Sequence, residues 1–270
     1  MLVEVVGGVV SGSLALLSDA AHMLTDILAL GLALVGYAIG ARPPDEKRTY
    51  GFHRAEILAA LVNGVILVGL SLVIAIEAGR RVMAPQPVDS KLMMVIAIAG
   101  LLANLVSMYI LRSGRADLNT RGAILHITAD AASSVGVIIG SWIITTTGWT
   151  VVDPILSALL SIFIVVGAYG LLRDSVNVLM EATPKGMRGG EVRRAILAVP
   201  GVRTLHDLHI WVLSSGVNSL SVHIVASKSR REDECAVMTR VKDLLRDKFD
   251  LTHTTIQVET ESFRETHPVH

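Results

Sequence analysis

The chain has 270 residues, of which 51% are hydrophobic, 4% aromatic and 18% charged. Charged residues make up about a quarter of an ordinary soluble domain, so this composition indicates a membrane protein. The 24 basic and 24 acidic residues cancel, which removes the argument for nucleic-acid binding, and the single Cys235 excludes disulfide frameworks and cysteine-rich zinc sites. Half of the charged side chains fall in residues 182–270, so we expect two regions with different solvents.

Five apolar stretches are long enough to cross a bilayer, which takes about 20 helical residues. They cover residues 19–40, 55–79, 92–111, 122–147 and 151–172. Residues 1–17 look like a further span, but Glu4 and a Gly pair leave it short, as though its outer half lay upstream. We therefore predict a membrane all-α bundle of six helices over residues 1–181, with the first helix truncated.

The charges in the links between the spans predict the orientation, because Lys and Arg gather on the cytoplasmic side of a membrane. The links at 41–54 and 112–121 carry four and three of them, whereas those at 147–150 and 11–18 carry none. The link at 80–91 is an exception with three. The bias predicts a multi-pass protein of the bilayer with both termini cytoplasmic, in the inner or plasma membrane if its source is bacterial.

Residues 182–270 have the texture of a small soluble domain, opened by a Pro- and Gly-rich stretch. Apolar residues at helical spacing end at Pro200-Gly201, and alternating runs at 202–213 and 218–226 predict two strands. A second helix ending near Phe249 and a third strand at 253–259 follow. The predicted order is αββαβ, an α+β domain.

Two His/Asp pairs stand inside predicted spans, where ionisable residues are costly and mark function. His22 and Asp26 are four residues apart, as are His126 and Asp130, so each pair lies on one helix face. Two imidazoles and two carboxylates provide the four nitrogen and oxygen ligands of a tetrahedral zinc ion. The sequence therefore predicts an intramembrane zinc site; the competing interpretation is that each pair only bonds neighbouring helices.

Three functions are compatible with such a site. An intramembrane zinc enzyme is one, but His-Glu-x-x-His is absent and four protein ligands leave no position for a reactive water. A membrane metal sensor without flux is another. We favour a transporter that carries the metal as cargo.

Several stretches resemble the cation diffusion facilitator family, in its zinc-transporting branch of the bacterial zinc, cadmium and cobalt efflux type. They are SGSLALLSDAAHMLTD, YGFHRAEILAALVNG, LHITADAASSVGVIIG, WTVVDPILSALLSIFI, LHDLHIW and TIQVE. The resemblance implies a homodimer of six-helix subunits with a metallochaperone-like cytoplasmic tail. It also implies export of divalent metal against protons by alternating access.

Secondary metal ligands are expected outside the paired motifs. By resemblance, His206, His223 and Glu259 match metal-binding positions of family tails, and His253 matches one approximately. Strand alternation predicts His206 and His209 on opposite faces, with His209 structural. His53, in the cytoplasmic link, is a candidate pick-up ligand at the cavity entrance. Zn²⁺ is thus predicted as transported substrate and as a structural or regulatory ion of the tail.

The charge of the paired site predicts exchange of zinc against protons. Zn²⁺ bound by two carboxylates and two neutral imidazoles is formally neutral, which a membrane interior tolerates. The empty site would carry two unpaired negative charges, so we expect it to return with protons bound.

Overall fold

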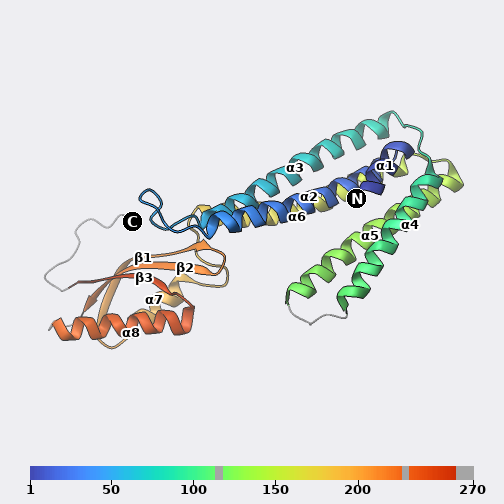
Figure 1. The fold of residues 1–270 in the computed structure, drawn as a ribbon. Coiled ribbons are helices and arrows are strands. Elements are labelled where there is room, and N and C mark those ends of the chain that lie inside the picture. Colours follow the sequence, from blue (N-terminus) through green and yellow to red (C-terminus); the bar gives the residue numbers. More distant parts are fainter. Residues whose placement is uncertain (113–117, 227–230, 260–270) are drawn as a thin grey trace. The chain divides into compact units, whose positions relative to one another are not determined.

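The computed structural model describes residues 1–112, 118–226 and 231–259. The chain divides into two compact units: a helical unit (Met1–Leu34 and Ala59–Leu172) and a mixed unit (Val35–Leu58 and Arg173–His270). The elements, labelled in Figure 1, are α1 (Leu2–Ser11), α2 (Leu14–Gly40), α3 (Arg54–Met83), α4 (Ser90–Arg112), α5 (Leu118–Thr147), α6 (Val152–Leu179), α7 (Gly189–Leu197), β1 (Val202–Ser214), β2 (Val217–Ala226), α8 (Arg231–Phe249) and β3 (His253–Glu259).

The five predicted spans are confirmed: α2 to α6 are each long and apolar enough to cross a membrane. The short first helix is confirmed as α1, but it ends before residue 17: its last residue is Ser11, and Gly12 adopts a left-handed φ of 71°. Ser13 then caps α2, since its Oγ accepts a hydrogen bond from the backbone N–H of Leu16 (3.2 Å). The cap starts α2 five residues before the apolar run from which it was predicted.

The core of the helical unit lies where α4 and α5, which run side by side, meet the start of α2. Met93 of α4 and Leu16 of α2 are almost completely buried there. A Cβ on Gly7 of α1 would collide with Ile96 of α4, so glycine is what allows these two helices to approach. Large apolar side chains on the outer faces stay exposed, as expected for helices whose solvent is lipid.

The mixed unit contains the predicted αββαβ domain. Its sheet has the order β1-β2-β3. Strands β1 and β2 are antiparallel, and β2 and β3 are parallel. Both α7 and α8 lie on the same side of the sheet (Figure 1). Ile196 of α7, Val222 of β2 and Leu245 of α8 have no exposed surface and belong to one apolar cluster. One sheet face therefore builds the core, and the other is available to polar residues.

A β-bulge in β1 changes which residues share a face of the sheet, compared with the prediction from strand alternation. His206 pairs with His223 and His209 with Ser221, so three steps on β1 match two on β2. Asp207 takes up the extra residue with a left-handed φ of 51°. The bulge brings His206 and His209 to the same sheet face, so the prediction that they lie on opposite faces is wrong.

Candidate metal centres

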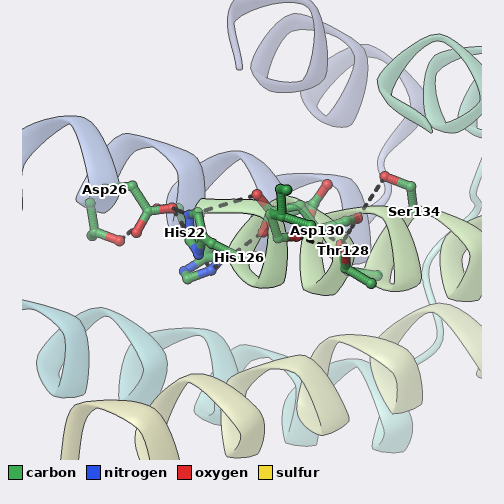
Figure 2. A network of polar contacts seen from close by, with 10 residues as sticks. His22, Asp26, His126, Thr128, Asp130 and Ser134 are labelled. Carbon is green, nitrogen blue, oxygen red and sulfur yellow. Dashed lines mark hydrogen bonds and ion pairs between the residues drawn. The ribbon is translucent and has the colours of Figure 1, made fainter. Parts of the chain in front are cut away.

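The first candidate centre lies between α2 and α5 in the helical unit. Figure 2 shows the imidazoles of His22 and His126 between the carboxylates of Asp26 and Asp130. The Nε2 atom of His126 is 3.3 Å from Asp26 Oδ2 and 3.7 Å from Asp130 Oδ2. The Nε2 atom of His22 is 3.8 Å from Asp26 Oδ2 and 3.9 Å from Asp130 Oδ1. The structure thus brings all four predicted side chains together.

These separations match the size of a zinc site. Ligand atoms about 2.1 Å from a tetrahedral zinc ion lie about 3.4 Å from one another. The donor atoms of His22, Asp26 and His126 all lie within 4.8 Å of each other, and Asp130 adds a fourth donor next to both imidazoles. Three donors thus fit one divalent ion by type and spacing, and the Asp130 carboxylate lies beside both imidazoles.

The four side chains differ in exposure along the helix axes. His126 and Asp26 are 48% and 35% exposed, whereas His22 and Asp130 are 24% and 14% exposed. The more exposed pair lies nearer to the end of α2 and the beginning of α5. The cluster is therefore more exposed toward one end of these helices and more covered toward the other.

A cavity of about 310 Å³ adjoins the covered side, between α2, α5 and α6. Its polar wall includes Asp19, which accepts a hydrogen bond from the hydroxyl of Ser133 (2.7 Å). Asp19 lies within α2, after its N-terminus, and its carboxylate joins α2 to α5 beside His22 and Asp130.

One polar residue in this unit has a contact that the sequence did not indicate. Asp153 precedes Pro154 at the start of α6, a pattern that predicts a packing bond or a helix cap. Both are present, but the capped helix is α2: the Asp153 carboxylate accepts hydrogen bonds from Leu14 N (2.7 Å) and Ala15 N (3.1 Å). Only the tertiary structure brings these two helix ends together.

The second candidate centre lies on the sheet face opposite the core of the mixed unit. Glu259 Oε1 is 3.1 Å from Nδ1 of His223 and 3.5 Å from Nε2 of His206. The two imidazole centroids are 5.2 Å apart, as expected for residues paired across β1 and β2. Glu259 is almost fully buried and also accepts a hydrogen bond from Gln257 Nε2 (3.0 Å). The three donors fit a divalent metal by type and spacing.

The remaining predicted ligands lie elsewhere. His253 is exposed at the opposite end of β3, where it pairs with Ser219, and its ring is 5.6 Å from that of Tyr50. The structure does not bring it to the Glu259 cluster. His53 lines a broad cavity of about 1020 Å³ within the mixed unit, together with His209.

His209 has a carboxylate partner that the alternating pattern of β1 did not predict. Its Nε2 is 2.9 Å from Asp207 Oδ1, and this hydrogen bond lowers the pKa of the Asp207 carboxyl from its usual value. Asp207 Oδ2 also lies 3.8 Å from His223 Nε2. The bulge therefore adds a second carboxylate beside the candidate centre.

The fold and the two clusters define a multi-pass membrane transporter for cations, and comparisons with known proteins agree. Residues 1–180 match the cation efflux transmembrane domain, and residues 184–261 match the cation efflux protein cytoplasmic domain. The chain therefore belongs to the cation diffusion facilitator family, as its sequence motifs predicted. Membership confirms a transporter with a cytoplasmic C-terminal domain and excludes the enzyme alternative.

Within that family, the chain is similar to the zinc, cadmium and cobalt efflux branch. It is 47% identical to the metal cation efflux system protein CzcD of Cupriavidus metallidurans, over 96% of this chain and 82% of the relative. It is 43% identical to the zinc transporter ZitB of Escherichia coli strain K12, over 96% and 83%. It is 38% identical to the cadmium, cobalt and zinc/H(+)-K(+) antiporter of Bacillus subtilis, over 97% and 85%.

A solved structure covers the tail alone. The metal-bound C-terminal domain of the CzcD transporter from Cupriavidus metallidurans matches 27% of this chain and 99% of its own length, at 49% identity and a TM-score of 0.25.

Proposed function

We propose that this protein exports Zn²⁺ from the cytoplasm in exchange for protons, with the ion bound by His22, Asp26, His126 and Asp130. The observation that carries the proposal is the convergence of these four side chains from two membrane-spanning helices at separations near those of a tetrahedral site. The mixed imidazole and carboxylate donors favour zinc over harder ions, which prefer oxygen alone.

Charge neutrality supports the proton exchange. The loaded site is formally neutral, whereas the empty site has two carboxylates and no Lys or Arg partner among the described contacts. Unpaired charge within a membrane is costly, so the empty site returns with protons on the groups that held zinc. Zinc and protons then compete for the same lone pairs. One relative is named as a zinc/H(+)-K(+) antiporter, which supports the same direction of exchange.

The rest of the chain fits a regulated dimer in a cell membrane. We assign residues 1–181 to the membrane domain and residues 182–270 to a cytoplasmic domain that joins two subunits. His206, His223 and Glu259 are the residues that would hold a structural or regulatory zinc ion there. His53 serves as a pick-up ligand beside a cavity that is large enough for a hydrated ion.

Zinc flux into proteoliposomes that contain a pH-sensitive dye tests the function. We expect zinc addition to move protons in the opposite direction, and collapse of an imposed proton gradient to slow zinc accumulation. Zinc movement that ignores the gradient would identify a uniporter or channel. Zinc binding without any flux would favour the membrane sensor and would overturn the proposal.

A further inference from the structure

The turn between α1 and α2 is held by the side chain of a residue from another helix. The carboxylate of Asp153 in α6 accepts hydrogen bonds from the Ser13 hydroxyl (2.6 Å), from Leu14 N (2.7 Å) and from Ala15 N (3.1 Å). Asp153 has no exposed surface. A carboxylate at a helix N-terminus compensates the positive end of the helix dipole and satisfies N–H groups that have no partner within the helix.

Two further contacts reach the same turn. Arg81 at the end of α3 donates from Nη1 to the carbonyl of Gly12 (2.7 Å), and the backbone N–H of Asp89 donates to the carbonyl of Ser11 (2.8 Å). The turn is therefore tied to α3, to the link before α4 and to α6. We call the contacts of Ser11–Ala15 with Arg81, Asp89 and Asp153 the outer clamp.

The clamp lies at the end of the bundle away from the cytoplasm. The C-terminal domain is cytoplasmic, so α6 ends on the cytoplasmic side and Asp153, at its start, lies at the opposite end. The turn bound by Asp153 is at that end too. From it, α2 runs toward the cytoplasm and reaches His22 after two turns.

The candidate metal centre is more exposed on one side than on the other. The two more exposed side chains, Asp26 and His126, are those nearer to the cytoplasmic ends of α2 and α5. On the far side lies the 310 Å³ cavity, which is lined by Ser18 of α2 and Leu156 of α6. Those residues are only one turn away from Leu14 and Asp153, whose hydrogen bond joins α2 to α6.

We propose that Asp153 is a positioning residue of the transport cycle, whose carboxylate closes the path from the metal centre to the non-cytoplasmic side by holding α2 against α6. The inference rests on the proposed function, because it assigns a place in the zinc exit path. Zinc that leaves outward has to pass the cavity and then the outer clamp. Release of the three hydrogen bonds is the local event that opens this end.

A single cysteine reports whether the clamp closes the cavity. Cys235 is the only cysteine, so Cys235→Ser removes the background. Gly136 lines the cavity, and a Cβ there meets no atom within 4 Å, so Gly136→Cys fits without strain. In intact cells, an impermeant thiol reagent outside the membrane labels this cysteine only when the outer end is open. The labelling rate therefore measures the open fraction.

Asp153→Asn is the test variant. An amide has one accepting oxygen, so at least one N–H or O–H group of the clamp loses its acceptor. Hydrogen bonds to charged groups are strong enough that we expect labelling from outside to rise about tenfold or more. Ser157→Ala is the matched control: Ser157 is also buried on α6, and the described hydrogen bond of its hydroxyl, to the Asp153 carbonyl, stays within α6. It should leave the rate unchanged.

An unchanged rate in folded Asp153→Asn protein, or an equal rise in Ser157→Ala, would overturn the proposal. If Asp153→Asn does not fold, Ser13→Ala removes one clamp bond and should raise labelling in the same direction; no rise there would also overturn it. Labelling does not depend on flux. A protein that moves no zinc but shows the expected labelling would refute the proposed function and leave the clamp intact.

Discussion

The two candidate centres use the same donors on different scaffolds. In the membrane, the backbone fixes the spacing: residues four apart on one helix face place an imidazole and a carboxylate together, and two such helices complete four ligands. In the sheet, His206, His223 and Glu259 come from three strands, and their contacts depend on register and on a bulge. The helical centre can therefore be recognised from the sequence, whereas the sheet centre depends on tertiary structure.

The centres also differ in what surrounds them. The membrane cluster is more exposed on one side, and a cavity adjoins its less exposed side. The cytoplasmic cluster includes Glu259, which is almost fully buried and bound by Gln257, so one ligand is already fixed in place. We infer that the membrane centre binds and releases its ion repeatedly, whereas the cytoplasmic centre keeps its ion bound.

The largest effect should come from the loss of one membrane ligand. Asp130→Ala leaves three donors, an open coordination position and a weaker site, so we expect zinc flux to fall to the level of empty liposomes. The fold should persist, because the change removes a carboxylate that has no Lys or Arg partner among the described contacts. Thr128→Ala is the matched control, since Thr128 lies between the two candidate ligands of α5 and its described hydrogen bonds are to Ile124 O and Met108 Sδ. Near-normal flux in Asp130→Ala would refute the ligand assignment.

A change of donor type should alter selectivity more than activity. His22→Asp replaces an imidazole by a carboxylate in the membrane centre, and oxygen-rich sites accept larger or harder ions such as Cd²⁺ and Mn²⁺. We expect the ratio of cadmium to zinc transport to rise by about tenfold. Competition assays measure the ratio directly. If cadmium gains nothing over zinc, the identity of the donor at position 22 does not set selectivity.

Most of the fold and the whole membrane cluster could be predicted from the sequence, because both depend on local periodicity. Apolar runs gave the five spans, and the four-residue spacing identified His22, Asp26, His126 and Asp130. Contacts that join distant segments were not predictable. The bond of Asp153 to the start of α2 spans 139 residues, and nothing in the local pattern distinguishes it from a cap of α6.

The bulge at Asp207 shows a second limit. A strand is recognised by alternation, and a single inserted residue reverses every face that follows. The apolar pattern of β1 tolerates this, because Leu208 still packs against the core from within the irregular stretch. Only pairing with β2 reveals that His206 and His209 share a face.

A smaller effect is expected in the cytoplasmic centre. Residues 184–270 alone should fold as a soluble domain, because their apolar core is made of their own residues. We expect this domain to form a dimer. Metal that binds only the folded domain stabilises it, so zinc at 100 times its Kd should raise the melting temperature by about 10 °C or more. His223→Ala should abolish the shift, and His253→Ala should preserve it. A melting temperature that does not change with zinc would show that this cluster is structural and does not bind the metal.

The smallest effect concerns the carboxylate that the bulge adds. The hydrogen bond from His209 lowers the pKa of Asp207 in the folded domain, so the ionised carboxylate favours folding. This contribution is fully present above the unfolded-state pKa of about 3.9 and disappears as the pH falls through the lower folded-state pKa. Because the pair lies near the surface, it should be worth less than about 1 kcal/mol.

Asp207→Asn isolates that contribution, because asparagine also tolerates the left-handed backbone at this position but does not titrate. In chelator-treated domain, the free energy of unfolding of the unmodified chain should exceed that of the variant above about pH 5, and the difference should shrink toward pH 3. Denaturant titrations at several pH values give the difference directly. A gap that stays constant between pH 5 and pH 3 would mean that Asp207 contributes through backbone geometry alone, and the sheet centre would then owe nothing to the charge beside it.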